Sequence, residues 1–170
     1  TCHLSVLKSV QQSESKIVAG VVDEAFATDE FEAYKRYPRA VKMAIAAAKE
    51  GIEMADITNY PSHKIGIVLG TAAGAMKEIA EYAQDANDLK TMPLHGVALV
   101  DAHTLSNAVC EVIGANGTSF TIMTGCTASI DALLVGQQLI QYGVIDVCLV
   151  GGADAPLNDW TTNGFKKIRA

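Results

Sequence analysis

SFTIMTGCTASIDALLVGQQLIQYGVIDVCLVGG (residues 119–152) holds the pattern that decides the fold. Ser119–Thr124 alternates with a period of two, Thr127–Tyr142 has the length and composition of a helix, and Val144–Val150 is apolar throughout. Two apolar strands joined by a helix are typical of a βαβ unit on a parallel sheet. Gly151–Gly152 follow the second strand, and we expect the strand to stop there.

Upstream of this unit the chain continues to alternate between strands and helices. Pro38 is expected at the first position of a helix with the sequence RAVKMAIAAAKEGIEMA, because a proline there loses no hydrogen bond. Apolar residues at helical spacing predict its packed face, namely Val41, Ala44, Ile45, Ala48 and Ile52. Further strands are predicted at 16–22 and 64–69, and further helices at about 75–86 and 105–112.

Composition limits the possible functions. Hydrophobic residues make up 49% of the 170 residues and charged residues 19%, which suits one well-buried α/β domain over residues 1–170. The net charge of −6 argues against nucleic acid as a partner, and no apolar run reaches the roughly 18 residues of a membrane helix. The four cysteines have no paired spacing, which favours a reduced, cytoplasmic protein.

The helix after Cys126 is apolar on most sides, as the run ALLVGQQLI shows. Helices of this kind are buried, often between two layers. We therefore expect a layered α/β sandwich with this helix in its interior.

Cys126 has either a chemical role or a packing role. Gly125 permits a sharp turn, so Cys126 would leave the strand at the N-terminus of the helix. The unpaired N–H groups and the dipole there favour a thiolate, and the same N–H groups can stabilise an oxyanion. The alternative is that Cys126 only fills space, as most cysteines do, and the local pattern leaves the two equally balanced.

A longer comparison favours the chemical role. TGCTASIDALLVGQQLIQYGVIDVCLVGGADAPL (Thr124–Leu157) resembles the active-site segment of the β-ketoacyl synthases of the thiolase superfamily. The words TGCTAS and DAPL are most similar to type II polyketide ketosynthases, followed by fatty-acid elongation synthases. KIVAGVV, IGIVLGTAAG and GANGTSFTIMT match in the same order, so the resemblance spans nearly the whole chain.

The resemblance implies a fold and an activity. The fold would be a thiolase-like α-β-α sandwich with a mainly parallel mixed sheet, of which this chain is the N-terminal half. Cys126 would be the nucleophile that accepts an acyl group, with its backbone N–H in the oxyanion hole and Thr124 and Gly125 forming the supporting turn. The acyl group would then undergo decarboxylative Claisen condensation with a malonyl thioester.

The family also implies partners. Substrates would arrive on the phosphopantetheine arm of an acyl carrier protein, with no metal or other cofactor. Lys35, Arg36 and Arg39 would dock that acidic carrier, although a solvated helix start is the more common reason for such a cluster. A homodimer, or a heterodimer with a chain-length factor, would pair through the edge strand at Ser119–Thr124.

One departure from the family keeps alternatives open. The two histidines and the lysine of the family's second half have no counterpart here, so we expect this half alone to be inactive in condensation. The same cysteine would also serve a thiolase-type enzyme that uses acyl-CoA. A non-catalytic chain-length or scaffold partner is the third possibility, although partners of that kind usually lack the cysteine.

Two further motifs are weaker. GTAAG (Gly70–Gly74) matches no phosphate-binding loop and is expected to be a structural turn. His95, Asp101 and His103 fit no standard metal spacing, so no metal is expected.

Overall fold

The computed structural model describes residues 2–6, 18–22, 32–85, 96, 99 and 101–169. A three-stranded parallel sheet forms its centre, in the order β4–β3–β5. The strands are β3 (Ile65–Gly70), β4 (Ser119–Ile122) and β5 (Val147–Gly152). Parallel pairing confirms the predicted crossover, which carries the chain past β3 from one side of it to the other.

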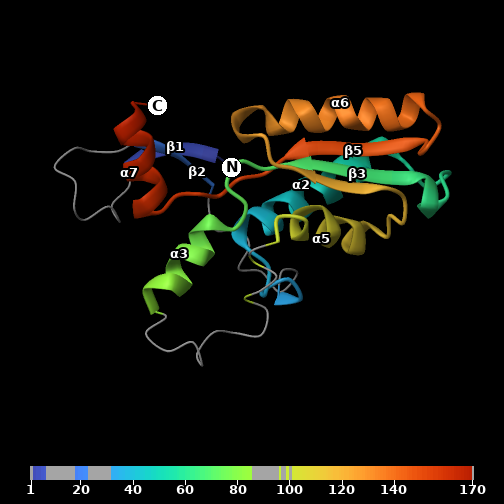
Figure 1. Ribbon diagram of the computed structural model, residues 1–170. Helices are drawn as coiled ribbons and strands as arrows, with labels where there is room; N and C mark the ends of the chain where they lie inside the picture. The colour runs from blue at the N-terminus through green and yellow to red at the C-terminus, as the bar shows by residue number, and fades with distance from the viewer. Residues whose placement is uncertain are drawn as a thin grey trace.

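Helices cover both faces of this sheet. In Figure 1, α6 (Ala128–Gln141) lies above the strands, and α2 (Arg39–Ala55) and α5 (Thr104–Ile113) lie below them. The three layers confirm the α/β sandwich predicted from the sequence. A separate antiparallel pair, β1 (Cys2–Val6) with β2 (Val18–Val22), and two helices, α3 (Met76–Asp85) and α7 (Asp159–Ile168), lie toward one end.

The described residues also include two short 3₁₀ helices, η2 (Ser62–Lys64) before β3 and η4 (Gly125–Thr127) before α6. No helix in the described ranges has both the length and the hydropathy that a bilayer-crossing segment requires.

The main core lies between the sheet and the pair α2–α5. Its largest fully buried members are Ile45 from α2, Ile67 from β3 and Val109 from α5. The predicted face of α2 is buried at Val41, Ala44, Ile45 and Ala48, whereas Ile52 is only half-buried. Burying such side chains contributes about 1.5–3 kcal/mol each, which makes this interface the main source of stability in the described sheet.

Three predicted boundaries were wrong by a few residues. Pro38 precedes the first helical residue of α2, because its extended ψ of 155° makes it the N-cap. β4 ends at Ile122, before Thr124. β5 continues through Gly151 and Gly152, because both glycines pair with β3 and so extend the strand instead of stopping it.

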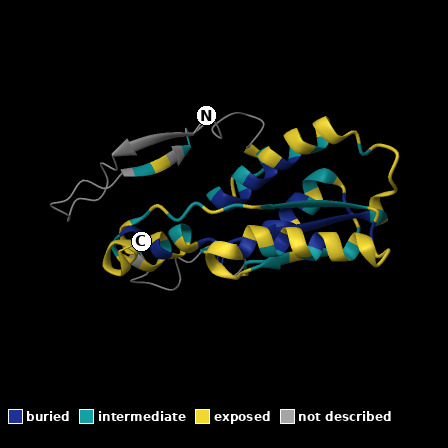
Figure 2. Cartoon of the chain, turned by 90° about the horizontal axis from the view of Figure 1, so that it is seen from above, coloured by how far each residue is buried: buried dark blue, intermediate teal, exposed yellow. Residues whose placement is uncertain are grey.

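The burial of α6 differs more from the prediction. Only Ala128, Ala132 and Gly136 are buried, and they face the strands. Ile130, Leu133 and Leu134 are between 53% and 70% exposed, and Figure 2 shows helices with long exposed faces. The described residues thus cover α6 on one side only.

Candidate active site

Cys126 lies in a turn between β4 and α6. Gly125 has a φ of +69°, in the left-handed region that glycine adopts without steric cost. Cys126 follows within η4, and α6 begins two residues later at Ala128. The Cys126 thiol is free and exposed. The sharp glycine turn predicted before the cysteine is therefore present, and the cysteine lies inside a short 3₁₀ segment that precedes the α-helix.

Close packing holds the start of α6 against the sheet. A Cβ on Gly70 would overlap the backbone carbonyl of Ala128, and one on Gly152 would overlap the hydroxyl of Ser129. Ala128 is itself buried. Glycines at the ends of β3 and β5 therefore allow the helix to begin directly over the strands, next to Cys126.

Two threonine hydroxyls and one carboxylate connect the turn to the helix. Thr127 Oγ1 donates to Asp131 Oδ2 at 2.8 Å, and Thr124 Oγ1 donates to the same oxygen. These bonds, first that of Thr124 and then that of Thr127, hold the pKa of Asp131 below its ordinary value. The sequence analysis gave no role to Thr127 or Asp131, although their i, i+4 spacing places them on one helix face.

Asp154 connects the neighbouring loops. Its carboxylate accepts hydrogen bonds from Thr71 Oγ1 at 2.8 Å and from the amides of Ala72 and Ala73 at 3.0 and 2.9 Å. The amide of Gly74 donates to Thr71 Oγ1. The donors of the GTAAG turn are thus occupied by an internal carboxylate, which agrees with the prediction of a structural turn.

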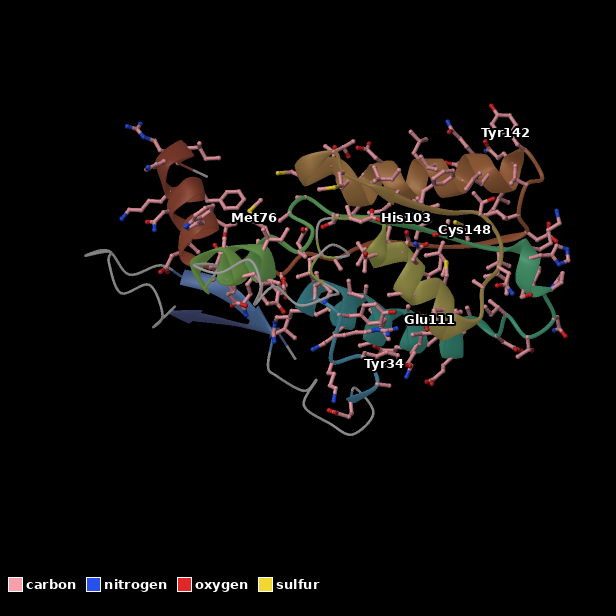
Figure 3. All side chains as sticks on the ribbon, turned by 60° about the horizontal axis from the view of Figure 1, so that its bottom comes forward. Tyr34, Met76, His103, Glu111, Tyr142 and Cys148 are labelled. Carbon is pink, nitrogen blue, oxygen red and sulfur yellow. The ribbon has the colours of Figure 1, made fainter. Side chains whose placement is uncertain are left out.

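The other cysteines differ from Cys126 in environment. Cys110 and Cys148 are half-buried, and the side chain of Cys2 lies outside the described residues. Burial raises the pKa of Cys148 to about 11. Figure 3 labels Cys148, which lies on β5. The sulfur of Cys148 would lie 3.0 Å from a Cβ placed on Gly136 of α6. The structure therefore supports a packing role for Cys148, as predicted.

The basic cluster before α2 divides into two parts. Lys35 pairs with Glu32, which raises the pKa of Lys35, and the guanidinium of Arg36 lies 5.2 Å from the ring centre of Tyr37. Both cations are exposed. Arg39 is instead partly buried, and its Nη2 donates to the carbonyl of Val22 at 2.6 Å. Arg39 thus connects β2 to α2, a structural contact that the sequence analysis did not predict.

The histidine motif shows no metal-binding arrangement in the residues that can be described. His95 lies outside them. The amide of His103 donates to Asp101 Oδ1 at 2.9 Å, and His103 Nδ1 lies 3.2 Å from Ser106 Oγ at the start of α5. No group of three candidate metal ligands occurs among the described residues.

Known proteins give this geometry a context. The family model of the β-ketoacyl synthase N-terminal domain matches residues 7–170. The ketoacyl synthase alpha subunit of the tetracenomycin polyketide synthase from Streptomyces glaucescens is 29% identical over 79% of this chain. The chain spans about a third of that relative, 34% of its length.

Solved structures with a similar fold include ketosynthases. A ketosynthase in complex with its chain length factor from Xenorhabdus doucetiae matches with a TM-score of 0.78 and 20% identity, over 99% of this chain and 43% of that one. A type II polyketide acyl-carrier protein in complex with its ketosynthase matches with a TM-score of 0.68 and 22% identity, over 81% and 36%. Both likenesses concern the fold, which is that of the thiolase-like ketosynthases.

The family model covers almost the entire chain. The parallel strands and the glycine turn before Cys126 are also those predicted from the segment around Cys126 that resembles the family. The protein belongs to the β-ketoacyl synthase family, and residues 7–170 correspond to the N-terminal domain of that family.

Proposed function

We propose that this chain is the N-terminal half of a ketosynthase and that Cys126 carries the growing acyl group. The exposed thiol of Cys126, placed by the left-handed Gly125 at the entry to α6, supports this proposal most directly. Cysteine suits the task because its thiolate is both a good nucleophile and a good leaving group for thioester exchange.

The reaction proceeds in two steps. In the first, the Cys126 thiolate attacks the carbonyl of an acyl thioester, the bond to the carrier sulfur breaks, and the carrier thiol leaves with a proton. The backbone N–H of Cys126 stabilises the oxyanion of the tetrahedral intermediate. In the second, a malonyl thioester loses CO₂, its carbanion attacks the acyl carbonyl, and the Cys126 thiolate is released. Residues for the decarboxylation belong to the family's second half.

The substrate arrives on the phosphopantetheine arm of an acyl carrier protein. Lys35 and Arg36 present exposed positive charge on an otherwise acidic chain, so they are suited to an acidic carrier. Arg39 contributes less to docking, because its guanidinium is engaged by Val22. Docking of a carrier protein has a precedent in the acyl-carrier protein complex of a ketosynthase with this fold.

The proposed assembly contains more than this chain. The ketosynthase–chain length factor complex offers a model for a heterodimer, and a homodimer through the edge of β4 is the alternative. The family's second half would cover the exposed face of α6 and supply the decarboxylating residues. We place this enzyme in the cytoplasm, in polyketide biosynthesis or, as the second choice, fatty-acid biosynthesis.

The decisive experiment measures acyl loading on the complete protein. Incubation with an acyl-carrier protein should add one acyl mass to the peptide that contains Cys126, and Cys126→Ala should abolish this addition. Cys110→Ala is the matched control, because Cys110 is half-buried on α5, and it should load as the wild type does.

Other results would favour the alternatives. Faster loading from acyl-CoA than from acyl-carrier protein would indicate a thiolase-type acyltransferase. Full activity of a reconstituted complex that contains Cys126→Ala would indicate a scaffold or chain-length partner. Unchanged loading of Cys126→Ala would contradict the proposal outright.

A further inference from the structure

The turn that carries Cys126 has little packing of its own. None of the residues in η4 is buried, and Thr124 on its N-terminal side is also exposed. By contrast, Ala128 and Ala132 of α6 are 3% and 0% exposed. The helix is thus fixed to the sheet, whereas the turn before it must be held by polar contacts.

Those contacts converge on one side chain. Thr124 precedes Cys126 by two residues, Thr127 follows it directly, and both hydroxyls donate to the same oxygen of Asp131. Thr127 Oγ1 also lies 3.1 Å from the carbonyl of Thr124, which closes the turn from both sides of the cysteine. Neither Thr124 nor Thr127 makes a side-chain cap bond, so their hydroxyls serve the aspartate instead.

Asp131 is well placed to act as an anchor. It belongs to the first turn of α6, next to the fully buried Ala132, so its backbone is fixed by the packing of the helix. A carboxylate in the first turn is also favoured by the helix dipole. The two hydroxyl bonds therefore transmit the position of the helix to the turn.

We propose that Asp131, through Thr124 and Thr127, is a positioning residue that holds Cys126 in register with the oxyanion-stabilising start of α6 during acyl transfer. This inference rests on the proposed function of Cys126. Asp131 touches no reacting atom in this role. It acts by fixing the backbone on both sides of the nucleophile, where a displacement of about 1 Å can cost a hundredfold in rate.

The elements packed against α6 offer the turn no other charged anchor among the described residues. The strands under α6, β3, β4 and β5, carry no charged side chain, and their one titratable group is Cys148. The loop after β5 adds Asp154, whose carboxylate is engaged by Thr71, Ala72 and Ala73. Asp131 is therefore the carboxylate that the hydroxyls of the turn engage.

Acyl loading of the complete protein tests this positioning role. The rate of acyl loading from acyl-carrier protein should fall about tenfold to a hundredfold in Thr127→Val and in Asp131→Ala. Thr127→Ser keeps the hydroxyl and should restore most of the rate lost in Thr127→Val. Asp146→Asn is the matched control, because Asp146 is an exposed carboxylate beyond the far end of α6, and it should load normally.

Alkylation of Cys126 with iodoacetamide provides a readout that needs no acyl transfer. At a fixed pH its rate should fall in Thr127→Val and in Asp131→Ala and recover in Thr127→Ser, because a displaced thiol loses the N–H groups at the start of α6. Recovery in Thr127→Ser separates the hydroxyl contact from a general loss of structure, and far-ultraviolet circular dichroism checks that each variant keeps the fold.

The two proposals fail in different ways. Wild type that does not load at Cys126 overturns the proposed function, and the alkylation rates still show whether Asp131 positions the thiol. Wild type that loads, together with Thr127→Val and Asp131→Ala that load at the same rate, overturns the positioning role and leaves the function of Cys126 intact.

Discussion

At the scale of single residues, the same thiol chemistry takes two forms in one chain. Cys126 is exposed at the start of a helix, whereas Cys148 is half-buried under Gly136 near the start of β5. Burial favours the neutral thiol of Cys148 and raises its pKa to about 11. Because the thiolate is the reactive form, position in the fold decides which cysteine can react.

This contrast predicts selective alkylation. At pH 8 iodoacetamide should modify Cys126 much faster than Cys148, because pH 8 lies far below the pKa of Cys148 and nearly all of its thiol is protonated. As the pH rises toward 11 the Cys148 thiolate forms, and its modification should accelerate. Peptide mapping by mass spectrometry measures both rates, and equal rates at pH 8 would contradict the assigned environments.

At the scale of secondary-structure elements, the spacing of apolar residues predicted the helices, whereas glycines in the strands determine how closely α6 packs on the sheet. The apolar spacing of α2 and the run IGIVLG of β3 indicated both elements, because packing follows the face that the pattern defines. The closeness of α6 to the sheet was not visible in the sequence. Gly70 and Gly152 contact the first turn of α6 across more than fifty and about twenty residues of chain, respectively, and no local pattern records such contacts.

The candidate site shows the same division. Gly125 and Cys126 were predicted from a local turn pattern, because left-handed glycine before a helix is a local property. The sequence did not predict that the Asp131 carboxylate accepts hydrogen bonds from the hydroxyls of Thr124 and Thr127. In the sequence, Asp131 looks like an ordinary acidic residue of a first helical turn. Likewise, the contact between Arg39 and Val22 joins distant segments, and its charge alone suggested only docking.

The close approach of α6 predicts a large effect for a small change. In Gly70→Ala the new Cβ would overlap the backbone of Ala128, which no side-chain rotation relieves, so the protein should lose about 3 kcal/mol or more of unfolding free energy. Gly51→Ala is the matched control. Gly51 lies inside α2 with open space around it, so alanine should stabilise the helix by about 0.5–1 kcal/mol.

Urea denaturation followed by circular dichroism measures both changes. A Gly70→Ala variant as stable as wild type would show that α6 can move away from the sheet. The position of Cys126 relative to β3 would then be less fixed than the packing indicates.

At the scale of the whole molecule, one face of α6 has no cover among the described residues. Ile130, Leu133 and Leu134 are all more than half exposed, whereas Ala132 on the opposite face is 0% exposed. The sequence predicted a helix buried on both sides, and the described residues supply one of the two layers. This difference arises because apolar residues on a helix predict that its faces are buried, but they do not identify the segment that covers each face.

The uncovered face predicts opposite results in two settings. In the 170-residue chain, Leu133→Gln with Leu134→Gln should change the unfolding free energy by no more than about 1 kcal/mol per site, because both side chains are already more than half exposed. The same pair should reduce self-association at high concentration, which sedimentation velocity measures, because a contiguous apolar patch drives it. Ala132→Gln, one residue away, should destabilise this chain by about 1–3 kcal/mol, since it forces a polar group into a packed interface.

In a longer ketosynthase whose second half covers α6, the double leucine variant should instead be strongly destabilising, because two buried leucines are replaced by amides. Equal stability of that longer variant and its parent would show that the face remains open to solvent, and the proposal that a second half covers α6 would then fail.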